Sequence, residues 1–199
     1  MKTRLITGLV LVNALASSAD DHSTPTPNPP VVISGRITVS AENLASLALE
    51  KPLAVAEGIR ITHMGVGRFD QTPPPAETGT DADLTPPRPA LSFTPANEIP
   101  FTPGNFFGWV VRFDTNRNNL TLTEEFVLPA PITISGGSGA TVVSDDGKTA
   151  TSPRDFPALW DWTYNFWGLE EGDPVGDHEF GVFLGETEIA RFKFKIIEP

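Results

Sequence analysis

The chain contains no cysteine, and this absence removes several kinds of site at once. Disulfides, thiolate zinc centres and cysteine nucleophiles all need the missing thiol group. A lipid anchor carried on an N-terminal cysteine is excluded for the same reason.

Basic residues are scarce, with 14 Lys and Arg against 25 Asp and Glu, so the formal charge is −11. Loss of Lys2 and Arg4 with a leader would take the charge two units further, to −13. Such a surface repels phosphate backbones and anionic lipids. Nucleic acid is therefore a poor partner, although an acidic balance is more often a matter of solubility.

Long apolar runs are absent except near the start, where residues 5–15 follow Lys2 and Arg4. Small residues stand at Ser17 and Ala19, the positions that precede a cut before Asp20. This pattern predicts a secretory signal peptide over residues 1–19, because the run is too short for a membrane anchor. The sequence thus predicts a periplasmic or secreted protein without membrane insertion.

Residues 20–30 are polar and proline-rich, which predicts a disordered arm. A single all-β domain is predicted for residues 31–199, because short strands recur every 8 to 15 residues with turn signals between them. Residues 41–50 are ambiguous, although three apolar residues there have the spacing of a short helix. Residues 71–104 hold many prolines, which predicts loop with at most an edge strand near 90–93.

Three strand patterns are clear enough to give the architecture. Residues 58–69 alternate, and Gly65 and Gly67 suggest a bulge or a close backbone approach. Residues 105–114 are nearly all apolar, which predicts a central strand, and residues 120–129 are expected to return beside it as a hairpin. Residues 178–197 form a second predicted hairpin. Together they predict an antiparallel, Ig-like β-sandwich.

The stretch "LWDWTYNFW" (159–167) places Trp160, Trp162, Tyr164 and Phe166 on one face of a strand. Exposure of such a row would forfeit several kcal/mol, so we expect it to face the core between the sheets. Asp161, Thr163 and Asn165 would then face outward. The alternative is a platform for sugar rings, and Trp167 is the ring that we expect to reach the surface.

No catalytic constellation is visible in the sequence. "GGSGA" (136–140) is one residue short of a nucleophile elbow, and a strand pattern follows Ser138 where the elbow needs a helix. The acidic stretches 81–84, 170–173 and Asp177–His178 do not match a calcium loop. Glu124 and Glu125 are adjacent and so face opposite ways on a strand. We therefore predict no catalytic residues, no metal and no cofactor.

Several stretches resemble the bacterial family DUF3859 over about residues 58–197. The matching positions are Ile99, Pro100, Gly104, Phe107 and Gly108, followed by Pro174, Gly176, Phe180 and Phe192. The family has no assigned activity. The resemblance implies an exported, sandwich-like binding or structural domain.

The function predicted from these features is a non-catalytic, exported binding or envelope-associated module with a protein or glycan partner. The alternative is a glycan-binding or glycan-acting accessory protein that uses surface tryptophans, and Trp109 and Trp167 are the predicted ligand-binding residues. A hydrolase built on Ser138 is the third hypothesis.

Overall fold

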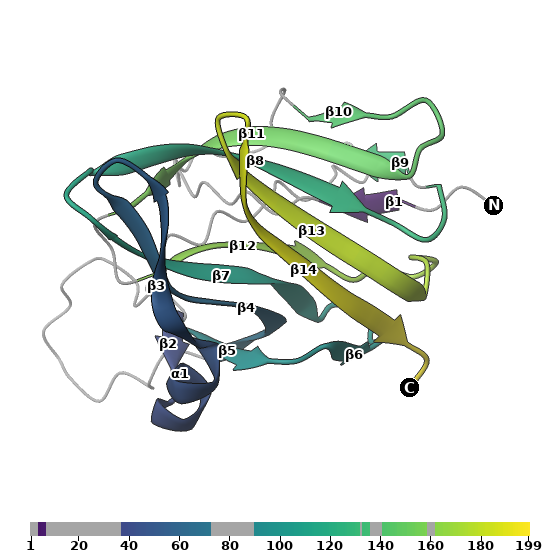
Figure 1. Cartoon of the computed structure of the whole chain (residues 1–199). Coiled ribbons are helices and arrows are strands. Elements are labelled where there is room, and N and C mark those ends of the chain that lie inside the picture. Colours follow the sequence, from purple (N-terminus) through teal and green to yellow (C-terminus); the bar gives the residue numbers. More distant parts are fainter. Residues whose placement is uncertain (1–3, 7–36, 73–89, 132, 136–140, 159–161) are drawn as a thin grey trace, which may run out of the picture.

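The computed structural model describes residues 4–6, 37–72, 90–131, 133–135, 141–158 and 162–199. Two large β-sheets face each other over this part of the chain, and one short helix lies at the end of the sandwich opposite β10 (Val142–Val143) and β11 (Thr149–Pro157) (Figure 1). The predicted all-β sandwich is therefore confirmed. None of the described helical segments is long and apolar enough to cross a bilayer.

The first sheet, named here the β7 sheet, is built around the most apolar strand of the chain. β7 (Phe106–Thr115) lies inside it, as its continuous burial requires. The strands follow the order β12 (Thr163–Gly168), β7, β4 (Ile59–Thr72), β5 (Ala90–Pro95) and β2 (Ile37–Val39). β3 (Ala48–Ala56) pairs with the first half of β4.

The second sheet, named here the β8 sheet, contains β8 (Asn119–Val127) as an inner strand. Its order is β10, β11, β8, β13 (Gly176–Leu184), β14 (Thr187–Ile197) and β6 (Glu98–Pro100). Most ladders are antiparallel, as predicted, but β6 runs parallel to β14 and β2 runs parallel to β5. A separate parallel pair joins β1 (Arg4–Ile6), which falls within the predicted leader, to β9 (Thr133–Ser135).

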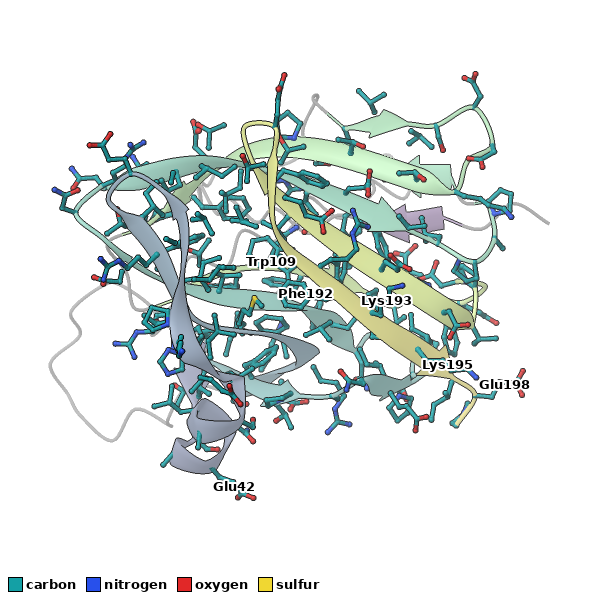
Figure 2. All side chains as sticks on the ribbon, in the orientation of Figure 1. Glu42, Trp109, Phe192, Lys193, Lys195 and Glu198 are labelled. Carbon is teal, nitrogen blue, oxygen red and sulfur yellow. The ribbon has the colours of Figure 1, made fainter. Side chains whose placement is uncertain are left out.

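The terminal hairpin forms as its alternation predicts. Phe192, Phe194 and Ile196 are buried against the other sheet, whereas Lys193 and Lys195 are exposed. Gly185 supplies the positive φ of 62° that the turn between β13 and β14 needs. Figure 2 shows Trp109 between the sheets and the two lysines along the outer side of β14.

The predicted hairpin between residues 105–114 and 120–129 is wrong. β8 pairs with β11 and β13, while β7 pairs with β4 and β12, so the chain passes from one sheet to the other at residues 116–118. Both edges of β7 are already paired within its own sheet, by β4 and β12. The crossing places the apolar faces of β7 and β8 in one core between the sheets, where burial of apolar surface stabilises the fold.

The ambiguous stretch after β2 forms the helix α1 (Ala41–Leu47). Ser40 caps it, because its side chain accepts a hydrogen bond from the backbone N–H of Asn43 at 3.2 Å. The chain then continues as β3, which the sequence did not indicate. Leu47 is buried beside Gly65, and a Cβ added at Gly67 would lie 2.1 Å from the backbone oxygen of Thr94. The close backbone approach predicted for this strand is therefore confirmed at Gly67.

The proline-rich region departs from its prediction at one point. β5 is paired on both sides, by β4 and β2, and is not an edge strand. Its proline, Pro95, lies at its end, where a missing N–H costs little. Residues 73–89, the arm at 20–30, and Ser138 lie outside the described residues.

Candidate functional site

The aromatic strand β12 has two buried faces, and the predicted direction of its aromatic row is wrong. Trp162 and Phe166 are buried, with exposed fractions of 8% and 6%, and Tyr164 is partly buried. They pack with Phe69 and Phe93 in a second apolar cluster, separate from the core between the sheets. This outer cluster includes Leu44 and Leu47 of α1.

The polar face of β12 points into the sandwich instead. Asn165 lies opposite Trp109 of β7 in the antiparallel ladder, so the two side chains share a face. Trp167 is on that same face by alternation and is fully buried, at 0% exposed. Thr163 is buried as well, and its hydroxyl donates to the carbonyl of Pro157 at 3.2 Å. Burial is thus confirmed for Trp162 and Phe166, but the inward face is the mixed polar one.

A carboxylate from the opposite sheet meets this face. Glu124 belongs to β8, where it takes an inward position between Leu122 and Phe126 and is only 1% exposed. Its Oε2 accepts hydrogen bonds from Trp109 Nε1 and from Asn165 Nδ2, the latter at 2.8 Å. Its Oε1 accepts one from Trp167 Nε1 at 2.9 Å. One side chain of the β8 sheet is thus tied to three of the β7 sheet.

The electrostatics of Glu124 are a balance of opposing effects. Burial raises the pKa of Glu124, because the charged form loses its hydration. The hydrogen bonds from Asn165, Trp109 and Trp167 and the positive charge of Arg154 act in the opposite direction. All three donors are N–H groups, and such a shell suits an acceptor-only carboxylate.

Arg154 completes the polar centre from β11. It is half-buried, and its Nη1 donates to Asn165 Oδ1 over 3.4 Å. Asn165 therefore bridges the two charges, because its amide nitrogen donates to Glu124 while its oxygen accepts from Arg154. Ser152, also on β11, is buried, and its hydroxyl lies 2.7 Å from that of Thr141.

Among the described residues, neither His63 nor His178 is hydrogen-bonded to Glu124. His178 is buried elsewhere: its Nδ1 lies 2.9 Å from the carbonyl oxygen of Gly176, and its ring stacks on Phe126 and Phe194. Burial lowers the pKa of His178, which favours the neutral ring. His63 contacts Trp162 edge-on, in the outer cluster region. The contacts of Glu124 are those of a structural tie.

The two predicted ligand-binding tryptophans are both part of this centre. Trp109 and Trp167 are each 0% exposed, so the expected exposure of Trp167 is wrong. Its indole N–H needs a partner in the interior, and Glu124 supplies it. A ligand-binding role for the two rings stays a prediction, and it would require the sheets to part. Trp160 lies outside the described residues.

The acidic stretches gather no metal-binding set in the part of the chain that the structure describes. There, no group of three or more His, Asp or Glu side chains is placed to hold an ion. Asp173 is buried in the turn after β12, where its Oδ2 accepts from the backbone N–H of Glu170 at 2.7 Å. Asp177 lies on β13 beside His178, and residues 81–84 lie outside the described ranges.

Sequence reasoning missed the centre itself. A signal was present, because Leu120, Leu122, Glu124 and Phe126 occupy one face of a strand, so Glu124 stands in an apolar row. An acid at such a position needs buried donors. The sequence could not indicate which strand provides them.

Comparison with known proteins gives a family match and one similar solved structure. A family model described as the PM0630 beta sandwich domain matches residues 84–197. An immunoglobulin-like protein (PA1606) from Pseudomonas aeruginosa aligns at 18% identity, over 73% of this chain and 100% of its own, with a TM-score of 0.46. The curated proteins give no match. The family match confirms that the chain belongs to a β-sandwich domain family. Its assignment to DUF3859 stays a prediction.

Proposed function

The chain belongs to the PM0630 beta sandwich domain family, and from that premise we propose that it is a non-catalytic binding module, exported to the cell envelope or the medium. The observation that carries the proposal is that the hydrogen bonds of Glu124 are all made within the protein interior. Both oxygens of this interior carboxylate are bonded to structural donors, and the side chain is 1% exposed. A catalytic acid must instead reach a reacting atom of the substrate.

Export is supported by the N-terminal sequence. Lys2 and Arg4, the apolar run and the small residues at Ser17 and Ala19 match a secretory leader. The acidic balance suits a protein that stays in solution. In this proposal, the partner binds to exposed strands and loops. The rigid sandwich holds the binding residues of these segments in place.

Export is tested by expressing the full chain in a bacterial host and fractionating the cells. We expect a mature protein outside the cytoplasm with an N-terminus at Asp20, read by mass spectrometry. Ala19→Arg is the matched control, because it removes the small residue before the cut, and it should leave the leader attached. A full-length wild-type chain that stays in the cytoplasm would contradict the proposal.

Binding is tested with the mature protein immobilised and exposed to an envelope extract. A captured protein is then purified and titrated against the module, and we expect saturable binding without chemical change in either component. Turnover of a captured component, followed by mass spectrometry, would instead indicate an enzyme. A glycan array tests the alternative of a glycan-binding accessory protein. Saturable binding to a defined sugar would indicate that the partner is a glycan and not a protein.

A further inference from the structure

The guanidinium of Arg154 has two sheltered N–H groups without an acceptor. Its Nε and Nη2 atoms are buried and have no hydrogen-bond partner among the described residues. An unsatisfied donor on a charged group costs more than one on a neutral group, and native structures nearly always satisfy it. Within the described residues, the two donors thus lack the acceptor that a buried charged group requires.

The position of the arginine on β11 explains why the donors turn inward. Ala150, Ser152 and Phe156 are buried at alternate positions of this strand, and Arg154 falls on the same face. The residue as a whole is half-buried, so the side chain extends from the surface toward the interior. Nε and Nη2 are covered by neighbouring atoms, so a ligand reaches them by displacing the side chains that lie over the guanidinium.

The orientation of the guanidinium is held from one side. Nη1 donates to Asn165 Oδ1 at 3.4 Å, and Asn165 is itself held by Glu124 at 2.8 Å. The guanidinium is planar, so the edge formed by Nε and Nη2 is opposite to Nη1 and faces away from Asn165. On that edge the two N–H bonds lie side by side, in the arrangement that matches the two oxygens of one carboxylate.

We propose that the Nε/Nη2 edge of Arg154 binds a carboxylate group of the ligand of this module. The charge of the centre selects a carboxylate over a phosphate. A phosphate dianion would need further cations, whereas the centre offers one guanidinium and already holds Glu124. The carboxylate belongs either to a small organic acid or to an Asp or Glu side chain of a protein partner. The assignment of a ligand rests on the proposed function.

The first test measures the thermal midpoint of the mature protein in sodium acetate, with sodium chloride and sodium sulfate at matched ionic strength. A ligand that binds only the folded state raises Tm by mass action. We expect a saturable rise in acetate below about 100 mM that chloride does not produce. No difference between acetate and chloride over that range would overturn the inference and would assign the donors to water.

Two variants locate the effect. Arg154→Lys keeps the charge and loses the paired donors, so we expect at least a tenfold weaker acetate response. Arg117→Gln removes an exposed arginine from the turn between β7 and β8 and should respond as the wild type does. An unchanged response in Arg154→Lys would contradict the inference. If Arg154→Lys does not fold, ¹⁵N spectra of the wild-type Arg154 Nε–H in acetate decide, since bound carboxylate must shift that resonance.

A blocked peptide with a single glutamate distinguishes the two sources of the carboxylate. Tenfold tighter binding of this peptide than of acetate, measured by calorimetry, indicates a protein partner, and equal or weaker binding indicates a small acid. Failure of carboxylate binding in a protein that is exported and captures a partner would overturn this inference alone. Cytoplasmic retention with intact carboxylate binding would overturn the proposed export alone.

Discussion

At the scale of single residues, Glu124 and Glu125 show how strand alternation separates two neighbours of the same chemistry. Glu124 is buried among N–H donors, while Glu125 lies on the outer face and pairs with Arg191 at 3.2 Å. The opposite directions were predictable from the sequence, because side chains alternate along a strand. The burial of Glu124 was not predicted, although the apolar residues at alternate positions beside it were a signal for it. The identity of its donors could come only from the fold.

Asp173 gives a prediction about pH. Burial raises the pKa of Asp173 to about 6, against the opposing effect of the backbone N–H of Glu170. The folded state therefore holds a proton that the unfolded chain releases, so the free energy of unfolding should fall as pH rises from about 4 to about 7. Asp173→Asn lacks this titration. Its stability relative to the wild type, from urea melts at several pH values, should increase over that range.

The comparison with the variant isolates Asp173 from Glu124, whose pKa is also raised and whose contribution has the same sign. A difference between Asp173→Asn and wild type that stays constant with pH, or that changes in the opposite direction, would contradict the assignment.

Trp162 tests the outer aromatic cluster. Its ring is 8% exposed and contacts His63, so truncation should leave a cavity. We expect Trp162→Ala to lower the free energy of unfolding by about 3–5 kcal/mol, measured in urea. Leu53→Ala serves as the control: this residue is 45% exposed, so the loss should be within about 0.5 kcal/mol. Equal effects of the two substitutions would show that the ring is not packed.

At the scale of elements, the terminal hairpin and the central strand β7 were predictable, because alternation and continuous burial are local patterns. The connection after β7 was not predictable. Residues 116–118 have the composition of a tight turn whether the chain returns within a sheet or passes to the other sheet. The choice depends on which edges of β7 are free, and β4 and β12 occupy both.

β12 shows the same limit. Alternation separates its aromatic face from its polar face, but it does not state which face lies between the sheets. The aromatic row is buried because α1 and neighbouring strands supply the outer cluster, and the polar row is accepted inside because Glu124 supplies acceptors. The residues that β12 packs against in the outer cluster, and Glu124, belong to segments that are distant from β12 in the sequence, so the pattern of β12 alone could not indicate them.

Close packing of β12 on β7 gives a prediction for Gly108. A Cβ added at Gly108 would lie 2.0 Å from the backbone oxygen of Asn165, which can move only with the strand. We expect Gly108→Ala to cost about 3 kcal/mol in a urea melt, as an overpacked site does. Gly168→Ala, whose Cβ would lie 3.5 Å from Phe106, should change stability by less than about 1 kcal/mol. Comparable losses in both variants would contradict this packing.

At the scale of the whole molecule, the family match and the sandwich do not have the same extent. The match covers residues 84–197, but β4 (Ile59–Thr72) lies between β7 and β5. A fragment of residues 84–199 would expose the inner edge of β7 and the outer cluster. We expect it to lack a cooperative thermal transition, whereas residues 37–199 should show one, by circular dichroism. Cooperative unfolding of the shorter fragment would show that β4 is dispensable.

The tie between the two sheets is the feature on which the proposed function depends, and a double-mutant cycle measures it. In Glu124→Gln, the amide oxygen should take the side with two donors, Trp109 and Asn165, so the NH₂ group meets the indole N–H of Trp167. Trp167→Phe removes that N–H. The two substitutions should therefore be coupled.

The decisive measurement is this cycle in urea, run beside a control cycle of Glu125→Gln with Trp167→Phe. We predict a coupling free energy of about 1–2 kcal/mol between positions 124 and 167, and additivity within about 0.5 kcal/mol between positions 125 and 167. Additive effects in both cycles would contradict a carboxylate that holds the two sheets together.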